Sequence, residues 1–261
     1  MSPLITGSLL ILTAIVHHGD AVINGEIAPH GFDYLVKIHY PNYDVNWSSG
    51  VLVSRKHILT SADSVYDRNR DYFVIIAERL SATIQIRFLS KIIIHPEYTP
   101  SQRSLDGYAT KGNDVAVLEM KEPLQFGQFH KMLKLLKPNQ SVPPRCIFAG
   151  WGVVDWHLYG HTYKILHKCS LTILSPAQCE ELFTKNRPAE LCAKDPKGIA
   201  YPGQGDEGGP LVCDDRIVGI YSRPVARKQE SSNHTAPPVT FMKVSSYYDF
   251  IKQAIASTNE E

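Results

Sequence analysis

The stretch Gly205-Asp206-Glu207-Gly208-Gly209-Pro210 is the most informative segment of this sequence. Its glycines surround two adjacent carboxylates, and a β-rich run at residues 210–213 follows directly. Glycine takes up backbone conformations that other residues avoid, so a segment of this kind is typical of a tight turn beside a strand. The stretch therefore predicts an acidic turn within a β-rich part of the chain.

Short β-rich runs separated by turn residues occur on both sides of this stretch. They lie at residues 33–39, 50–53, 57–60, 73–76, 91–94 and 115–118, and again at residues 146–152, 169–174, 210–213 and 217–221. This spacing is typical of an all-β barrel or sandwich. An amphipathic segment from Ser245 to about Ala256 predicts a terminal helix.

The bulk composition describes a globular protein without a strong charge preference. The chain has 261 residues, 43% of them hydrophobic, and a formal net charge of +1. It can therefore bury a substantial core. The balance of 27 basic and 26 acidic residues argues against an overall electrostatic footprint for nucleic acid or anionic membrane.

The N-terminus predicts secretion. An apolar run from Leu4 to Val16 has the length of a signal-peptide core, and Gly19 with Ala21 offers a cleavage pattern of small residues. We expect a signal peptide at residues 1–21, with an N-terminal membrane anchor as the alternative. Three glycosylation sequons are compatible with an extracellular protein, at Asn46, Asn139 and Asn233.

Two long polar stretches, residues 99–113 and 223–238, are candidate binding surfaces, because loops of this length are often functional. The second contains Arg223, Arg227 and Lys228. These basic residues are either merely solvated or form an exosite for an acidic protein or glycosaminoglycan.

Five motifs, taken in order along the chain, resemble the chymotrypsin/trypsin family of serine proteases. They are Val22-Ile23-Asn24-Gly25, Leu59-Thr60-Ser61-Ala62-Asp63-Ser64, Asn113-Asp114-Val115-Ala116-Val117-Leu118, Ala149-Gly150-Trp151-Gly152 and residues 203–210. The resemblance implies an all-β fold of two six-stranded antiparallel β-barrels with a C-terminal α-helix. It places a trypsin-like domain at residues 22–261, with barrels at about 22–130 and 131–261.

The resemblance implies that Asp63, Asp114 and Glu207 occupy the positions of the family's catalytic triad. Asp114 keeps the orienting carboxylate, whereas Asp63 replaces the histidine and Glu207 replaces the serine. A serine hydroxyl attacks a carbonyl after the histidine takes its proton, and carboxylates cannot reproduce that pair of tasks. We therefore expect a degenerate triad without catalytic residues.

The substrate pocket is also altered at the positions that the resemblance assigns to it. Tyr201 stands at the pocket floor, followed by Pro202, and a bulky ring there is expected to fill the slot. Arg223 and Pro224 replace the last two residues of the family's Ser-Trp-Gly strand. Proline cannot donate an amide to a bound peptide.

The five cysteines follow the family in part. The resemblance implies disulfides between Cys146 and Cys213 and between Cys179 and Cys192, both suited to an oxidising compartment. Ser48 and Ser64 stand where the family has a further pair. Cys169 is left over, either as a buried free thiol or in an intermolecular bridge.

Cleavage after Ala21 would create an amine at Val22. In the family, the mature N-terminus inserts and pairs with the aspartate before the nucleophile, which is Asp206 here. We therefore predict a salt bridge from Val22 to Asp206 that forms without a tryptic activation step.

Three carboxylates close together cannot all ionise cheaply. Asp63, Asp114 and Glu207 could form either a pair of carboxylates like that of an acid protease or a metal site. Hard cations need more oxygen ligands than these three residues offer, so no metal is expected. Glu207 can instead accept hydrogen bonds from the amides of its own loop and fill the former oxyanion hole. A glycan on Asn46 would further obstruct peptide entry.

These substitutions predict a secreted, catalytically inactive serine protease homologue that acts by binding extracellular proteins, including components of complement, clotting or another protease cascade of innate immunity. Inactive homologues of arthropods, among them inactivated protease paralogues of parasitic mites, are similar. Two alternatives remain open: an enzyme with carboxylate-based hydrolytic chemistry, and a decoy that sequesters protease inhibitors. We expect no cofactor, and neither a nucleic acid nor a membrane as partner.

Overall fold

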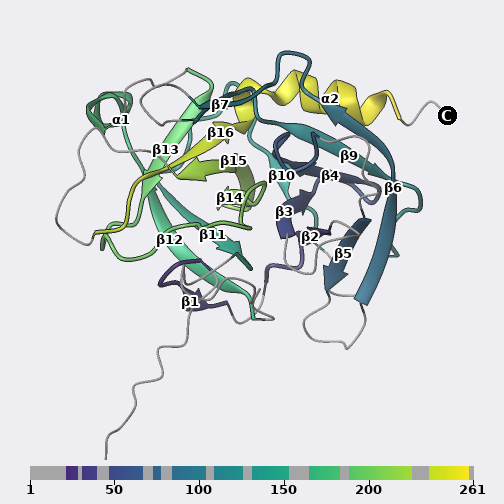
Figure 1. Ribbon diagram of the computed structural model, residues 1–261, viewed down its shortest axis with the longest axis horizontal. Helices are drawn as coiled ribbons and strands as arrows, with labels where there is room; N and C mark the ends of the chain where they lie inside the picture. Colours follow the sequence, from purple (N-terminus) through teal and green to yellow (C-terminus); the bar gives the residue numbers. More distant parts are fainter. Residues whose placement is uncertain are drawn as a thin grey trace, which may run out of the picture.

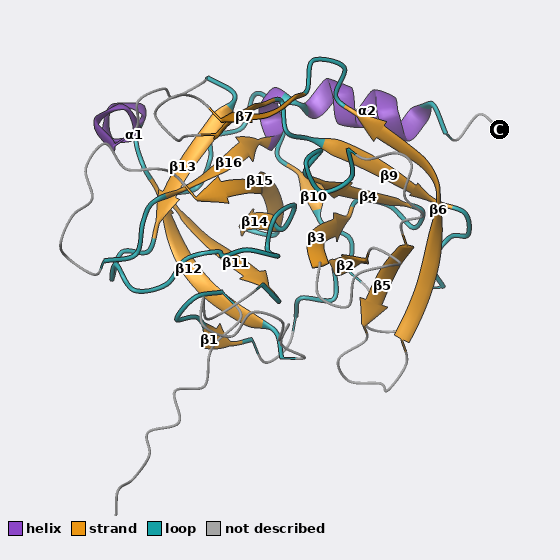
Figure 2. Ribbon diagram, viewed as in Figure 1, coloured by secondary structure: helices purple, strands orange, loops and turns teal. Residues whose placement is uncertain are grey.

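The computed structural model describes residues 22–28, 31–39, 47–66, 73–77, 84–103, 109–125, 131–152, 165–182, 188–224 and 235–258. The predicted signal peptide and the sequons at Asn46 and Asn233 lie outside these residues. The described part confirms the predicted all-β fold with a C-terminal helix (Figures 1 and 2).

Six antiparallel strands close the first barrel, on the right in Figure 1. The alternation of side chains explains why strand β2 forms: Val36 and Ile38 are buried, whereas the alternate residues Lys37 and His39 are partly exposed. Around the barrel the strands follow the order β2 (Leu35–His39), β3 (Trp47–Leu52), β4 (His57–Thr60), β9 (Ala116–Met120), β6 (Ile84–Ile94) and β5 (Phe73–Ala77).

The second half of the chain forms an eight-stranded sheet together with β1 from the N-terminal part, which the sequence had assigned to the first barrel; this sheet is on the left in Figure 1. Strand β12 pairs with β11 on one side and with β13 on the other, and this second pairing curls the sheet back on itself. The order is β1 (Glu26–Ile27), β12 (His167–Ile173), β11 (Arg145–Gly150), β14 (Pro210–Cys213), β15 (Arg216–Pro224), β16 (Val239–Lys243) and β13 (Glu190–Lys194), with β10 (Lys134–Leu135) beside β15.

One segment expected to be a long polar loop contains regular structure. Strands β7 (Thr99–Arg103) and β8 (Ala109–Gly112) pair as a two-stranded antiparallel sheet. Backbone hydrogen bonds hold the two strands together. Because most of their residues are polar, the sequence has no alternating apolar pattern that would predict a strand. Residues 225–234 of the other long polar stretch lie outside the described part of the chain.

The C-terminal segment confirms the predicted helix, slightly shortened at its start. A 3-10 turn at Val244–Ser246 precedes helix α2 (Tyr248–Ala256), which runs along the first barrel at the top of Figure 1. Its buried side chains are Ile251 and Ala254. Helix α1 (Pro176–Leu182) is short, and no helix in the described ranges has the length and apolar character that a membrane crossing requires.

Candidate functional site at the junction of the two sheets

The turn at residues 203–209 is pressed against the first barrel, which explains its glycines. Gly205 and Gly208 have φ values of 90° and 82°, in the left-handed region where other residues are strained. A Cβ atom on Gly208 would collide with the side chain of Thr60 and the carbonyl oxygen of Ser49. The sequence therefore allows a close approach that any larger residue would prevent.

Two hydrogen bonds join this turn to strand β3. The Ser49 amide donates to the carbonyl oxygen of Glu207 at 2.7 Å, and the Ser49 hydroxyl donates to the carbonyl oxygen of Gly205 at 3.3 Å. The turn also bonds to itself, because the Gly205 amide donates to Oε2 of Glu207 at 2.6 Å. The partly exposed Glu207 carboxylate thus accepts a hydrogen bond from an amide of its own loop, as the sequence predicted.

Asp63 and Asp114 lie in direct contact. The Asp63 amide donates to Oδ1 of Asp114 at 2.7 Å, and the Ser222 hydroxyl donates to Oδ2 at 2.5 Å. Asp114 precedes β9 in the sequence and is fully buried, whereas Asp63 follows β4 and is partly exposed. Asp114 therefore ties β15 of the second sheet to the first barrel and fixes the backbone of Asp63.

Tyr98 and Ser222 are members of the site that sequence reasoning missed. The Tyr98 hydroxyl donates to Oδ1 of Asp63 at 2.9 Å. Burial, together with the negative charges of Asp63 and Asp114, raises the pKa of Tyr98, so the phenol keeps its proton and stays a donor. Ser222 had a signal, because it matches the serine of the family's Ser-Trp-Gly strand; Tyr98 had none.

Asp206, a residue of the same turn, is fully buried, and its carboxylate accepts hydrogen bonds from two backbone amides. Gly152 donates to Oδ1 at 2.8 Å and Gly203 to Oδ2 at 2.9 Å. A Cβ atom on Gly150 or Gly152 would collide with this carboxylate, which explains the glycines of the 149–152 motif. Burial raises the pKa of Asp206 to about 7, against the opposing effect of the two amides.

The predicted partner of Asp206 lies in the same half of the molecule. Val22 is fully buried, in the core cluster against which Tyr201 packs, and Ile23 forms an isolated bridge with Tyr201. The chain continues before Val22, so its nitrogen is an amide here. The salt bridge between the Val22 amine and Asp206 stays a prediction for the cleaved chain.

The altered pocket positions lie close to these groups. Tyr201 is half-buried, and its amide donates to the Ile23 carbonyl oxygen at 3.1 Å. The carbonyl oxygen of Pro202 accepts the hydroxyl of Tyr221, a fully buried ring, at 3.1 Å. Arg223 and Pro224 end strand β15 and pair with β16.

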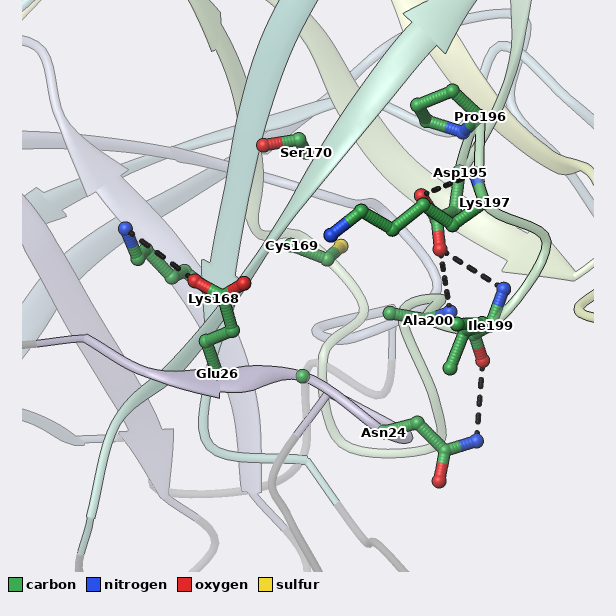
Figure 3. Close-up of a pocket in the computed structure, with 11 residues that line it drawn as sticks. Asn24, Glu26, Lys168, Cys169, Ser170, Asp195, Pro196, Lys197, Ile199 and Ala200 are labelled. Atoms are coloured by element: carbon green, nitrogen blue, oxygen red, sulfur yellow. Dashed lines mark hydrogen bonds and ion pairs between the residues drawn. The ribbon is translucent and has the colours of Figure 1, made fainter.

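Two disulfides brace the second sheet, with the pairing that the resemblance implied. Cys146 bonds to Cys213 and Cys179 to Cys192. Cys169 is a buried free thiol, and burial raises its pKa well above the ordinary value, with Asp206 and Asp195 acting in the same direction. It borders a cavity of about 240 Å³ whose other lining residues include Asn24, Glu26, Lys168 and Lys197 (Figure 3).

The described ranges contain no group of three His, Cys, Asp or Glu side chains arranged to hold a metal ion. The structure brings Asp63 and Asp114 together, and it places Glu207 on the neighbouring turn, with its carboxylate on Gly205. The chemistry available at this junction is therefore that of carboxylates oriented by hydrogen bonds.

The Trypsin family model matches residues 22–251, so the chain belongs to the trypsin family. Granzyme H of Homo sapiens is 28% identical over 95% of this chain and 97% of its own length. Granzyme C of Mus musculus is 30% identical over 95% of this chain and 96% of its own. The solved structure of neuropsin, a serine protease expressed in the limbic system of mouse brain, matches with a TM-score of 0.72 and 24% identity, covering 88% of this chain and 98% of that structure.

These relatives contradict the prediction of a catalytically inactive protein that acts only by binding. They are granzymes, which are serine proteases, and they match across almost the entire chain. The error has a physical reason. A missing serine hydroxyl excludes an ester intermediate on residue 207, but it does not exclude hydrolysis by a water molecule that a carboxylate activates. The narrower similarity to inactive arthropod homologues is not shown either.

Proposed function

We propose that this protein hydrolyses polypeptides at the junction of its two sheets, with water as the nucleophile and carboxylates as the acid and base groups. Membership of the trypsin family supports polypeptides as the substrate class. The observation that carries the proposal is the placement of Glu207, which lies in the turn at 203–209 with Oε2 2.6 Å from the Gly205 amide.

The chemistry follows from the side chains present. A carboxylate at position 207 can take a proton from water as the water oxygen attacks the peptide carbonyl, and it can return that proton to the departing amine. Asp63 is the second group of this kind, and the Tyr98 hydroxyl holds it in place at 2.9 Å. A substrate carbonyl reaches the Gly205 amide only after Glu207 has released it, so substrate binding has to move this side chain.

The test is cleavage of a diverse peptide library from about pH 3 to pH 9. We expect cleavage that reagents directed at active serines do not inhibit. We also expect at least a hundredfold loss, on the order of the usual contribution of an acid–base group, in Glu207→Gln and in Asp63→Asn. Asp249→Asn is the matched control, because Asp249 is an exposed carboxylate in the first turn of α2.

Two results would overturn the proposal. One is the absence of cleavage throughout the pH range by protein whose fold is verified by circular dichroism. The other is cleavage that Glu207→Gln and Asp63→Asn leave at the level of the Asp249→Asn control, since the carboxylates would then have no part in it.

We further propose that the protein is secreted and meets extracellular proteins, with components of complement, clotting or similar protease cascades as the expected class. Its two disulfides support an oxidising compartment. N-terminal sequencing of the protein secreted by cultured cells should find Val22 as the first residue. Incubation with serum, followed by sequencing of new N-termini, should identify cleaved proteins; a serum without new termini contradicts this substrate class.

A further inference from the structure

A buried histidine connects the first barrel to the end of the C-terminal helix. His57, the first residue of β4, is only 1% exposed. Its Nδ1 lies 2.6 Å from the hydroxyl of Ser54, and its Nε2 lies 2.6 Å from the hydroxyl of Thr258, just beyond α2. The contact with Thr258 spans 201 positions of the sequence, so it holds together two parts of the fold that no local structure connects.

The surrounding hydrogen bonds determine which ring nitrogen carries the proton. The Thr258 hydroxyl donates to the Ile255 carbonyl oxygen at 2.9 Å, so its oxygen accepts from Nε2–H of His57. Nδ1 then has no hydrogen and accepts from the hydroxyl of Ser54. The Ser54 oxygen itself accepts the amides of Lys56 and His57, each at 3.0 Å. Every donor in this network has an acceptor when the imidazole is neutral.

Protonation of the ring destroys this match. Nδ1 would become a donor facing the hydroxyl of Ser54, whose oxygen already uses both lone pairs to accept amides. The Ser54 hydrogen would also have to turn away from the ring. The contact between His57 and Ser54 therefore places two hydrogen-bond donors against each other, and the buried ring becomes charged.

We propose that neutral His57 fastens the end of helix α2 to the first barrel, and that acidification releases this end. The helix end is then a pH-sensitive latch on a segment remote from the junction site, so this proposal is independent of the proposed hydrolysis.

The charged groups around His57 act in both directions. Glu119 of β9 pairs directly across from His57 and favours the charged ring, whereas Lys56, bonded to Glu119 at 2.5 Å, disfavours it. The partial negative charge at the C-terminal end of α2 also favours the charged ring, as Glu119 does. Burial is the largest effect and lowers the pKa of His57 below its ordinary 6.5. The charged residues of α2, Asp249 and Lys252, lie in its first half, away from Thr258.

Hydrogen exchange of the full chain tests the latch at its point of action. The amide of Ser257, bonded to Gln253 at 2.9 Å, reports the end of α2. After correction for intrinsic rates, we expect its protection to fall about five- to tenfold between pH 7.4 and pH 5.0, the effect of one lost hydrogen bond. Thr258→Val should show the reduced protection at both pH values.

The control variant is Ser257→Ala, which removes a neighbouring hydroxyl that donates to the Ala254 carbonyl oxygen. It should keep the pH dependence of the unmodified protein. Nitrogen chemical shifts of the His57 ring should report the Nε2–H form at pH 7.4. The proposal fails if protection is equal at both pH values in the unmodified protein, or if Thr258→Val retains the full drop.

Discussion

The two halves of this molecule share an architecture of antiparallel strands but are held together differently. The second half contains all five cysteines of the chain, four in strands of the sheet and Cys179 in helix α1, and two disulfides link its segments. The first barrel has none, and Ser48 and Ser64 are the positions at which the resemblance implied a cysteine pair of the family. The first barrel therefore closes through non-covalent interactions, chiefly apolar burial and backbone hydrogen bonds, without a disulfide.

The two halves also respond to pH in opposite ways. Buried Asp206 in the second half has a raised pKa, and buried His57 in the first barrel has a lowered one. Both effects arise because burial disfavours the charged form. For the acid this penalty grows as the pH rises, and for the base it grows as the pH falls.

Removing the Cys146–Cys213 disulfide should have the largest effect on stability. The two cysteines are 67 positions apart, and opening a loop of this size costs about 4 kcal/mol in the unfolded-chain model. Cys146→Ala with Cys213→Ala should lower the free energy of unfolding by that order in urea titrations. Cys169→Ala, which breaks no bridge, is the control. Equal losses in both variants would show that packing, rather than the bridge, stabilises this half.

Asp206 should make the second half less stable as the pH rises, as long as the chain continues before Val22. The pKa is about 7 in the folded chain and 3.8 ordinarily, so the folded state binds more protons between these values. Stability should fall across this range by at most about 4 kcal/mol. Asp206→Asn should flatten this part of the profile.

A chain that begins at Val22 sharpens the same measurement. Its amine would favour the charged carboxylate if the predicted salt bridge forms, and the fall between about pH 4 and pH 7 should then disappear. A profile identical to that of the longer chain would count against the pairing of Val22 with Asp206.

Cysteines at positions 48 and 64 should give the first barrel the covalent closure that it lacks. Ser48 and Ser64 are both buried and lie 16 positions apart, so a bridge between them should add about 3 kcal/mol. The Ser48→Cys and Ser64→Cys double variant would be compared in oxidised and reduced forms by thermal unfolding. No stabilisation on oxidation would mean that the barrel has diverged from the geometry that the family's bridge requires.

Ser48→Ala should have the smallest effect. The Ser48 hydroxyl is buried and has no hydrogen-bond partner among the described residues. Its removal should stabilise the protein by no more than about 1 kcal/mol. Thr60→Val is the contrasting variant, because the Thr60 hydroxyl donates to the Ser49 carbonyl oxygen at 2.7 Å, and its loss should destabilise by about 1 kcal/mol. Chemical denaturation of both variants decides between these signs.

The strands were predictable because apolar residues and turn residues alternate along the chain, and the family motifs placed the carboxylates. The β7–β8 pair was not, since its hydrogen bonds are between backbone groups and its side chains are polar. Tyr98 and Thr258 reach their partners across 35 and 201 positions, and no local pattern marks such contacts. The identities of residues 63 and 207 did not predict the function, because an activity depends on the whole site.

Cys169 has a consequence for how the protein matures. Five thiols can form two bridges in about 15 ways, since any one of them can be left out and the remaining four pair in three ways. Only one arrangement buries Cys169 in the second sheet with both native bridges formed. In partly folded chains this thiol is an available attacker of either bridge. Once buried, with its pKa raised, it holds too little thiolate to do so, and completion of the fold ends disulfide shuffling.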